Sequence, residues 1–317
     1  MEVIISVIMP IYQVEKYIEN SIKSICNQTF RDFEVVLVND GTRDKSIILA
    51  EGILNDENIK YKIINQENAG VSSARNIGIK ESKGKWIICI DPDDIISPDL
   101  LEKLYLACIN FKTNVSFCNY QVVKNDNIFK DPGHTGENIV FSQKQIIKKF
   151  LKRKIVIISP SMLINKEFLI NNNIFYNEEI RFSEDQYFIW NVLFNLSAIT
   201  YVGTPLYNYF IRENSTMTSS NIHKIMTGYD AFINLESDIN DCFNYKKKIL
   251  PRWIFGVMSS STIMLEYEEY KILAEKLHYK KYIKCLICFP DLKVKILTIV
   301  MVINLKLFYK INKSLRG

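Results

Sequence analysis

The chain has 317 residues, of which 48% are hydrophobic and 24% are charged. This balance excludes a disordered or fibrous protein, and the length favours one large globular domain with an appendage, or two domains. The net charge of +5 is uneven, because residues 271–317 carry eleven Lys or Arg against two acidic residues, a sum of +9, and the first 270 residues sum to −4. The basic C-terminus therefore predicts contact with an anionic surface.

Strand and helix patterns alternate over the first 120 residues. Apolar runs predict strands at 4–11, 33–40, 61–66 and 86–91, and helical spacing predicts helices at 14–28, 45–54, 72–82 and 99–110. We expect Ser97 to cap the last of these helices, with Pro98 at its first position. The alternation predicts an open, doubly wound α/β sheet, in which ligands bind beyond the carboxyl ends of the strands. Asp40 and Asp91 fall at such ends.

The pattern is less regular after residue 120. Residues 124–136 are polar and rich in turn formers, and helices are predicted at 142–154, 161–171 and 183–195. Ser183 and Gln186 form a capping-box pattern at the start of the third helix. Residues 199–212 are strand-like, and from about residue 229 onward only helices are predicted.

The N-terminus and the cysteines indicate the compartment. Residues 1–13 lack a basic n-region, which favours a first strand over a signal peptide. The seven cysteines are odd in number and scattered, which is typical of buried thiols in a reducing cytosol. Cys285 and Cys288 have neither a second cysteine pair nor a histidine at finger spacing, so we expect two half-buried thiols there rather than a zinc site.

Three carboxylates follow the predicted strand at 86–91, in the sequence WIICIDPDD. On an extended chain, side chains two residues apart face the same way, so we expect Asp91 and Asp93 to converge while Asp94 turns away. Two carboxylates together with substrate phosphates suit Mg²⁺ or Mn²⁺. The alternative is that these aspartates stabilise the start of the next helix without any further function.

Two other positions add weight to this edge of the sheet. Asp40 is followed by a Gly-Thr turn that would expose its carboxylate, although an Asp-Gly turn needs no function. The sequence Asn-Ala-Gly at 68–70 precedes a helix that carries Arg75 in its first turns. A guanidinium beside a helix N-terminus favours a phosphate or nucleotide, but a surface arginine would give the same pattern.

Taken together, three segments resemble the N-terminal half of a family 2 glycosyltransferase: PIYQVEKYIENSIKSICNQTFRDFEVVLVNDGTRDKS, NAGVSSARNIGI and GKWIICIDPDD. FSED at 182–185 is similar to the acidic pair on the acceptor side of that family, and residues 207–215 are similar to its closing Arg-x-x-Ser segment. The resemblance covers residues 4 to about 220. It does not cover the C-terminal third.

The resemblance implies an α/β, GT-A type doubly wound mixed sheet flanked by helices, with a C-terminal helical extension. The implied divisions are a nucleotide-sugar-binding half at 1–120, an acceptor-binding half at 121–228 and a helical region at 229–317. The resemblance also implies roles for single residues. On the nucleotide, Asp40 would bond the nucleobase, Arg75 would close over the nucleotide, and Arg212 with Ser215 would bind the leaving diphosphate. Asp91 and Asp93 would form the D-x-D pair, with Asp93 touching the metal, and Asp185 would be the general base.

The implied chemistry is glycosyl transfer from a nucleotide sugar. A divalent cation on the D-x-D pair and a guanidinium would stabilise the departing diphosphate. The acceptor hydroxyl is a weak nucleophile unless a base removes its proton, and a single carboxylate suffices for inversion. The alternative for Asp185 is that it stabilises the first turn of its helix without a catalytic role.

Residues 292–310 combine an apolar run with flanking lysines. Lys295 and Lys306 are separated by ten residues, and these form roughly 15 Å of helix, about half of a hydrocarbon core. We expect an amphipathic helix that lies on an anionic leaflet, at the inner face of the cell membrane, rather than a membrane span. The alternative is a helix packed on the protein's own body or on a second subunit.

The sequence therefore predicts a metal-dependent inverting glycosyltransferase of bacterial surface-polysaccharide synthesis. By family analogy, its donor would be UDP-linked and its glycan acceptor lipid-linked. A sugar-nucleotidyltransferase or a dinucleotide oxidoreductase would have a glycine-rich loop after the first strand, where residues 10–13 read PIYQ. A catalytically idle membrane scaffold with the same fold is the other alternative. No nucleic-acid partner is expected, and a homo-oligomer is left open.

Overall fold

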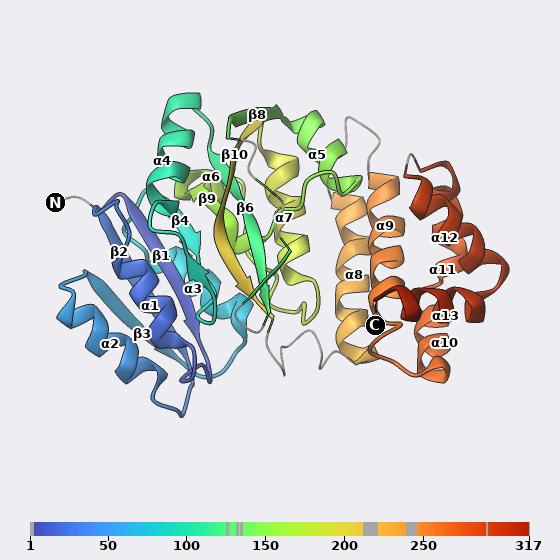
Figure 1. The fold of residues 1–317 in the computed structure, drawn as a ribbon, viewed down its shortest axis with the longest axis horizontal. Helices are drawn as coiled ribbons and strands as arrows, with labels where there is room; N and C mark the ends of the chain where they lie inside the picture. Colours follow the sequence, from blue (N-terminus) through green and yellow to red (C-terminus); the bar gives the residue numbers. More distant parts are fainter. Residues whose placement is uncertain are drawn as a thin grey trace. The chain divides into compact units, whose positions relative to one another are not determined.

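The computed structural model describes residues 3–124, 127–130, 133, 136–211, 221–238, 246–289 and 291–316. The chain divides into two units (Figure 1). Unit 1 comprises residues 1–146, 156–178 and 185–213, and unit 2 comprises residues 147–155, 179–184 and 214–317. Both predicted halves of the GT-A domain fall mainly in unit 1, and the predicted helical region falls in unit 2.

The described part of unit 1 contains one ten-stranded sheet in which β3, β2, β1, β4, β9, β6, β10 and β5 are neighbours in that order. Strands β1 to β4 pair in parallel, and β9 runs antiparallel to both of its neighbours, β4 and β6. The predicted mixed sheet is thus confirmed. The strands are β1 (Ile5–Ile11), β2 (Phe33–Asp40), β3 (Tyr61–Gln66), β4 (Trp86–Cys89), β5 (Ile95–Ile96), β6 (Val115–Lys124), β7 (Asn127–Lys130), β8 (Asn138–Ser142), β9 (Met162–Asn165) and β10 (Ala198–Phe210).

Helices cover both faces of this sheet because its central strands are apolar on both sides. On β1, Val7 and Met9 belong to the core shared with α1 (Ile18–Cys26), α2 (Ser46–Asp56) and α4 (Leu100–Phe111). Ile8 faces α3 (Val71–Glu81), and a Cβ on Gly78 would lie 2.3 Å from Cγ2 of Ile8. Glycine therefore lets α3 approach the sheet closely.

Two predicted elements are wrong in detail. Asp99, not Ser97, is the N-cap of α4, and Pro98 lies in the turn before that helix. The helix predicted at 161–171 is the strand β9 followed by α6 (Lys166–Asn171). Residues 162–165 lie between β4 and β6, where ladder hydrogen bonds on both sides override a local helical pattern. The side chain of Asn165 then caps α6 by accepting from the Phe168 amide.

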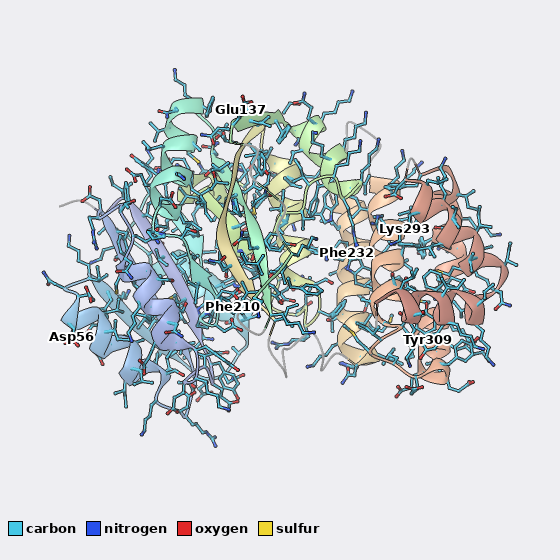
Figure 2. All side chains as sticks on the ribbon, viewed as in Figure 1. Asp56, Glu137, Phe210, Phe232, Lys293 and Tyr309 are labelled. Atoms are coloured by element: carbon cyan, nitrogen blue, oxygen red, sulfur yellow. The ribbon has the colours of Figure 1, made fainter. Side chains whose placement is uncertain are left out.

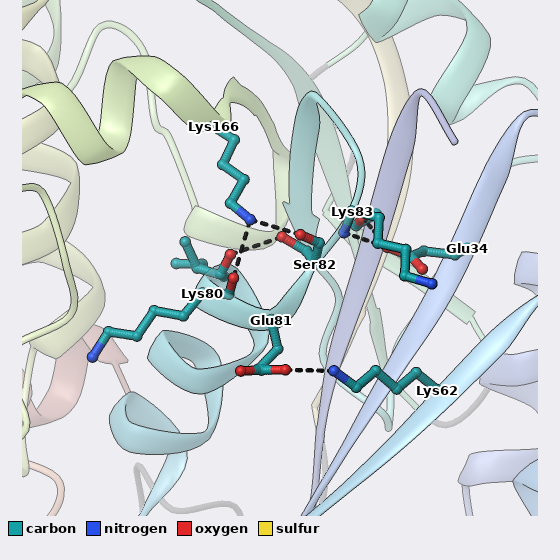
Figure 3. A network of polar contacts seen from close by, with 9 residues as sticks. Glu34, Lys62, Lys80, Glu81, Ser82, Lys83 and Lys166 are labelled. Atoms are coloured by element: carbon teal, nitrogen blue, oxygen red, sulfur yellow. Dashed lines mark hydrogen bonds and ion pairs between the residues drawn. The ribbon is translucent and has the colours of Figure 1, made fainter. Parts of the chain in front are cut away.

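Charged side chains fix the backbone at the amino ends of the strands (Figure 3). Lys166 Nζ donates to the carbonyl oxygens of Lys80 (3.1 Å) and Ser82 (2.6 Å), at the C-terminal end of α3. The carboxylate of Glu34 accepts from the Lys83 amide at 2.6 Å and from a buried serine hydroxyl of β1 at 2.7 Å. These groups satisfy main-chain atoms that no helix or strand partner reaches.

The described elements of unit 2 from residue 222 onward are helices, as predicted. They are α8 (Ile222–Asp238), α9 (Lys246–Ser260), α10 (Tyr267–Lys276), α11 (Tyr279–Ile283), the 3₁₀ helix η2 (Lys284–Cys288), α12 (Leu292–Ile303) and α13 (Leu305–Arg316). The rings of Phe232 and Trp253 stack with centroids 5.0 Å apart and join α8 to α9 (Figure 2). The apolar stretch 292–310 is two helices separated at Asn304, which is extended. Among the described residues, no helix has the length and hydropathy that crossing a bilayer requires.

The described cysteines largely match the prediction of buried thiols. Cys26, Cys89, Cys108 and Cys118 are buried and free, and burial raises the pKa of Cys108 to about 12. Cys285 is exposed rather than half-buried. Its thiol lies 3.1 Å from the carbonyl oxygen of Tyr282, at the end of α11.

Candidate active site

The acidic segment that follows β4 is a turn. The Asp94 amide donates to the carbonyl oxygen of Asp91 at 3.2 Å, with Pro92 at the second position of the turn. The extended geometry expected for this segment is therefore wrong, and the strand itself ends at Cys89. Since the chain reverses here, the neighbouring carboxylates enter different surroundings.

Asp94 points into the protein, where it is 1% exposed. Its carboxyl group accepts hydrogen bonds from the Tyr207 hydroxyl at 2.6 Å and from the Phe210 amide at 2.9 Å. Burial raises the pKa of Asp94 well above its ordinary value, and the carboxylates of Asp91 and Asp93 raise it further. Asp94 thus holds the end of β10 against the acidic turn.

Asp40, which ends β2, is also buried. Its Oδ1 accepts from the Gln66 side chain at 2.6 Å and from the Ala69 amide at 2.8 Å, and its Oδ2 accepts from the Gly70 amide at 3.0 Å. Gly70 has a φ of 96°, a conformation that favours glycine, and directly precedes α3. Asp40 therefore shapes the loop that leads into α3, and its contact with a nucleobase stays a prediction.

Arg75 lies at the centre of the site. It projects from α3 and is 3% exposed. Its Nη2 is 2.6 Å from Oδ1 of Asp91, and its Nη1 is 2.7 Å from Oδ1 of Asp185, at the start of α7 (Glu184–Asn195). The guanidinium lies over the ring of Tyr176 at 5.0 Å from its centroid. The hydroxyl of Ser159 donates to the same oxygen of Asp185 at 2.9 Å.

The surroundings favour the charged form of Arg75 and disfavour the charged form of Asp91. Desolvation lowers the pKa of Arg75, but the carboxylates of Asp185 and Asp91 outweigh it and raise that pKa well above its ordinary value. Burial raises the pKa of Asp91, and Asp185 adds to this effect, while Arg75 opposes it. Two carboxylates against one guanidinium, with the half-buried Asp93 nearby, favour an additional cation.

The comparisons with known proteins decide the family. The sequence model of glycosyl transferase family 2 matches residues 6–172, which is more than half of the chain. The chain belongs to this family. It is 29% identical over 272 residues to EpsH of Bacillus subtilis (strain 168), whose name describes a glycosyltransferase, and the match covers 82% of this chain and 76% of EpsH.

Other relatives share shorter segments of sequence. The chain is 38% identical over 149 residues to the minor teichoic acid biosynthesis protein GgaB of the same bacterium, a match that covers 45% of this chain and 16% of GgaB. The full activity and substrates of such longer relatives therefore do not transfer to this glycosyltransferase by alignment.

Solved structures confirm the predicted GT-A fold. The crystal structure of TarS 1-349 from S. aureus in complex with UDP-GlcNAc aligns with a TM-score of 0.73 at 19% identity, and the match covers 99% of this chain and 91% of that 1-349 chain. The mannosyltransferase PcManGT from Pyrobaculum calidifontis, in complex with GDP-Man and Mn²⁺, aligns with a TM-score of 0.57 at 11% identity and covers 96% and 88%. At these identities, the likeness is one of fold.

The described acidic residues fit a metal ion that substrate oxygens help to bind. Among the described residues, no group of three or more His, Cys, Asp or Glu side chains could hold a metal on its own. A hard cation such as Mg²⁺ is usually held by one or two carboxylates plus substrate phosphates, and the turn after β4 carries the carboxylates of Asp91 and Asp93. Arg212 and Ser215 lie outside the described residues.

The start of α7 differs from the predicted capping box. Ser183 has a φ of 67°, in the left-handed region, whereas an N-cap residue is normally extended. Asp185 is the second residue of α7, so it lies in the first turn as predicted. The sequence did not predict that Arg75 and Ser159 bind its carboxylate.

Sequence reasoning missed two residues of this site, and it assigned no role to an exposed aromatic residue at the carboxyl end of β1. Ser159 and Tyr176 carry no local signal, because they meet Asp185 and Arg75 only in the folded chain. Tyr12 had a signal: it is an aromatic residue directly after the first strand, inside the segment PIYQ. It is 45% exposed beside the fully buried Ile11, which leaves a ring surface accessible at the carboxyl end of β1.

Proposed function

We propose that this family 2 glycosyltransferase is metal-dependent and inverting. It transfers a sugar from a UDP-linked donor to a hydroxyl of a glycan acceptor in bacterial surface-polysaccharide synthesis. The observation that carries the proposal is that Asp91 and Asp185, the predicted metal carboxylate and the predicted base, bind the same guanidinium of Arg75. The names of GgaB and of the TarS complex with UDP-GlcNAc support the polymer class and the nucleotide.

On the donor side, Asp91 and Asp93 would hold Mg²⁺ or Mn²⁺, with Asp93 in direct contact. The cation supplies Lewis-acid stabilisation of the leaving diphosphate when it is bound. Arg212 and Ser215 would bind the same diphosphate. For the nucleobase we assign the exposed ring of Tyr12 as a stacking surface, because every base presents a π face and because β1 pairs with β2 up to Ile11 and Asn39, just before Tyr12 and Asp40.

On the acceptor side, Asp185 removes the proton of the attacking hydroxyl. Arg75 and Ser159 both bind its Oδ1, and this arrangement fixes the carboxylate while leaving Oδ2 for the acceptor. Because Arg75 and Ser159 hold this carboxylate in place, the base gains from orientation. A single base on the face opposite the leaving group gives inversion in one displacement.

The test separates donor binding from transfer. Calorimetry with a panel of nucleoside diphosphates, each with Mn²⁺ and with EDTA, should show one nucleotide that binds only with the metal. Asp185→Asn should keep that binding and lower the transfer rate by about 10³-fold, within the range of general-base removal. Asp56→Asn, at the exposed end of α2, is the matched control and should leave both unchanged.

Three results would contradict the proposal. Transfer at a near wild-type rate by Asp185→Asn would remove the base assignment. Absence of any nucleotide binding by folded protein would favour a catalytically idle scaffold, and pyrophosphate-dependent formation of a nucleotide sugar would favour a sugar-nucleotidyltransferase.

The proposal includes a location. We place the enzyme at the inner face of the cell membrane, as a peripheral protein that acts on a lipid-linked glycan. The support is the strongly basic C-terminal region, which sums to +9 over residues 271–317 and would be attracted to an anionic leaflet.

A further inference from the structure

Helix α12 carries apolar side chains on two opposite faces. The inner face is buried within unit 2 and consists of Val294, Leu297, Thr298 and Met301. The outer face consists of four large aliphatic residues that remain exposed to solvent. These residues, which we call the outer stripe, are Leu292 (71% exposed), Ile296 (53%), Ile299 (41%) and Ile303 (78%).

The outer stripe is narrow and regular. At roughly 100° of rotation per residue, its four side chains fall within an arc of about 60°, directly opposite the buried face. A surface helix in water normally presents polar residues on that side. Four neighbouring exposed aliphatic side chains on one helix face therefore indicate a surface that an apolar medium covers.

The surrounding charge identifies that medium. Lys293 and Lys295 border the outer stripe on its two sides at the N-terminal end of α12, and Lys293 is exposed (Figure 2). Residues 292–316 contain no Asp or Glu. Their basic residues are Lys293, Lys295, Lys306, Lys310, Lys313 and Arg316. Lysines that flank an apolar face match an anionic lipid headgroup layer over a hydrocarbon layer.

The outer stripe is preformed, because α13 fixes the C-terminal end of unit 2. Tyr309 donates to the carbonyl oxygen of Leu265 at 3.0 Å. The Asn312 side chain donates to the carbonyl oxygen of Ser259 at 2.5 Å and to the Thr262 hydroxyl at 2.9 Å. The side of α13 that carries Tyr309 and Asn312 thus faces the interior, and binding through α12 requires no folding of a disordered tail.

We infer that the outer stripe of α12 inserts into the interfacial layer of an anionic bilayer, with the flanking lysines at the lipid phosphates. A second copy of this chain is a poorer occupant, because its stripe would bring an equally basic border against the first. The inference rests on the proposed function only for the reason why the protein would bind a membrane, since an enzyme with a lipid-linked acceptor must reach a bilayer. The binding itself is measurable without donor or acceptor.

The test is sedimentation of the full chain with vesicles of phosphatidylglycerol and phosphatidylcholine, compared with vesicles of phosphatidylcholine alone. The wild type should bind only the anionic vesicles. The triple variant Ile296→Gln, Ile299→Gln, Ile303→Gln should bind about tenfold or more weakly, because it loses the inserted apolar surface. A variant with Lys293→Gln, Lys295→Gln and Lys306→Gln should also bind more weakly and depend less on salt.

A matched control keeps the number and type of substitutions. Ile48, Ile109 and Ile170 are isoleucines of unit 1 helices that are 70%, 47% and 45% exposed. Their triple change to Gln should leave vesicle binding unchanged. Circular dichroism and thermal unfolding report whether each variant is folded.

Three results would overturn the inference. They are vesicle binding that survives the outer-stripe variant, absence of binding to anionic vesicles by the wild type, and a dimer in light scattering that the outer-stripe variant dissociates. The last result would assign the stripe to a second copy of the chain. Since none of these measurements involves sugar transfer, the inference and the proposed function fail independently.

Discussion

The two ends of the parallel strands use charged side chains in different ways. At the amino end, Lys166 and Glu34 bond to main-chain carbonyl and amide groups. At the carboxyl end, Arg75 lies between the carboxylates of Asp91 and Asp185. A charge that satisfies the backbone stabilises the fold, whereas a buried cluster of charges costs desolvation and persists where function requires it.

The same distinction separates the aspartates of the carboxyl end. Asp40 and Asp94 accept hydrogen bonds from backbone amides of the loop before α3 and of β10. Asp91 and Asp185 bind Arg75 instead. Acidic residues close together in one fold region can thus divide into those that brace the backbone and those that we propose to face a substrate, while the contact of Asp40 with a nucleobase stays a prediction.

Volume alone does not locate the chemistry. An open hollow of about 1110 Å³ lies at the amino end of the strands, and its lining includes Lys60, Lys62, Lys83, Lys85 and Lys166. Lys166 is committed to backbone carbonyls and Lys62 pairs with Glu81. The carboxylates that meet Arg75 lie at the other end of the sheet.

The largest expected effect compares Asp91→Asn with Asp94→Asn. Asp91→Asn removes a carboxylate that we propose to bind the metal, and it should lower the transfer rate by about 100-fold or more, with weaker metal-dependent nucleotide binding. Asp94→Asn should change the rate by less than about threefold, because an amide can accept from Phe210 and donate to Tyr207. Equal losses in steady-state assays of the two variants would contradict the division between bracing and substrate-facing aspartates.

Arg75 tests the cluster itself. Arg75→Gln should lower the turnover number by about tenfold to 100-fold, because Asp185 loses its orientation. It should also lower the free energy of unfolding by about 1–3 kcal/mol, less than for a fully buried pair, since the partner carboxylates are partly exposed. The turnover number and the unfolding free energy of Arg75→Lys should lie between those of wild type and Arg75→Gln, because an ammonium cannot bridge both carboxylates. Steady-state kinetics and urea unfolding measure the two effects, and an unchanged turnover number in Arg75→Gln would refute the positioning role.

Substitutions at the amino ends of the parallel strands should lower stability and leave the turnover number almost unchanged. Lys166→Met removes charge-assisted hydrogen bonds to two carbonyl oxygens and should cost about 1–2 kcal/mol of unfolding free energy. The turnover number should stay within about twofold of wild type, since this end faces no substrate. Lys85→Met, which changes an exposed lysine at the same edge, is the control for charge. A large decrease in the turnover number of Lys166→Met, with an unchanged free energy of unfolding, would contradict the distinction between the two ends of the strands.

The smallest effect is a pH dependence. The pKa of Asp94 is raised in the folded state, so the folded protein retains a proton that the unfolded chain has released above its ordinary pKa. This contribution to stability is present at low pH and is lost as pH rises towards the folded pKa. Asp94→Asn should remove it, so the melting temperature of the variant relative to that of wild type should rise as the pH increases above the ordinary aspartate range. A difference that is constant with pH would contradict the raised pKa.

The sequence predicted most of the first half of the fold, because those elements depend on local patterns. β2 and β3 have the predicted bounds, and the alternation of strands and helices was sufficient for the α/β sheet. For the site, the sequence predicted which residues take part but not how they contact one another. Asp91, Asp185 and Arg75 were each assigned separate roles, and nothing in their spacing indicated that one guanidinium binds both carboxylates.

By itself, the sequence determined the family, the order of the elements and the candidate residues, because motifs and hydrophobic periodicity are local properties of the chain. Only the tertiary structure decided that residues 162–165 form a strand between β4 and β6, that Asp94 turns inward and that Arg75 meets Asp185. It also decided which apolar face of α12 is buried and which is exposed. Each of these outcomes depends on partners distant in sequence, and competition for hydrogen bonds and buried surface is settled only when those partners pack together.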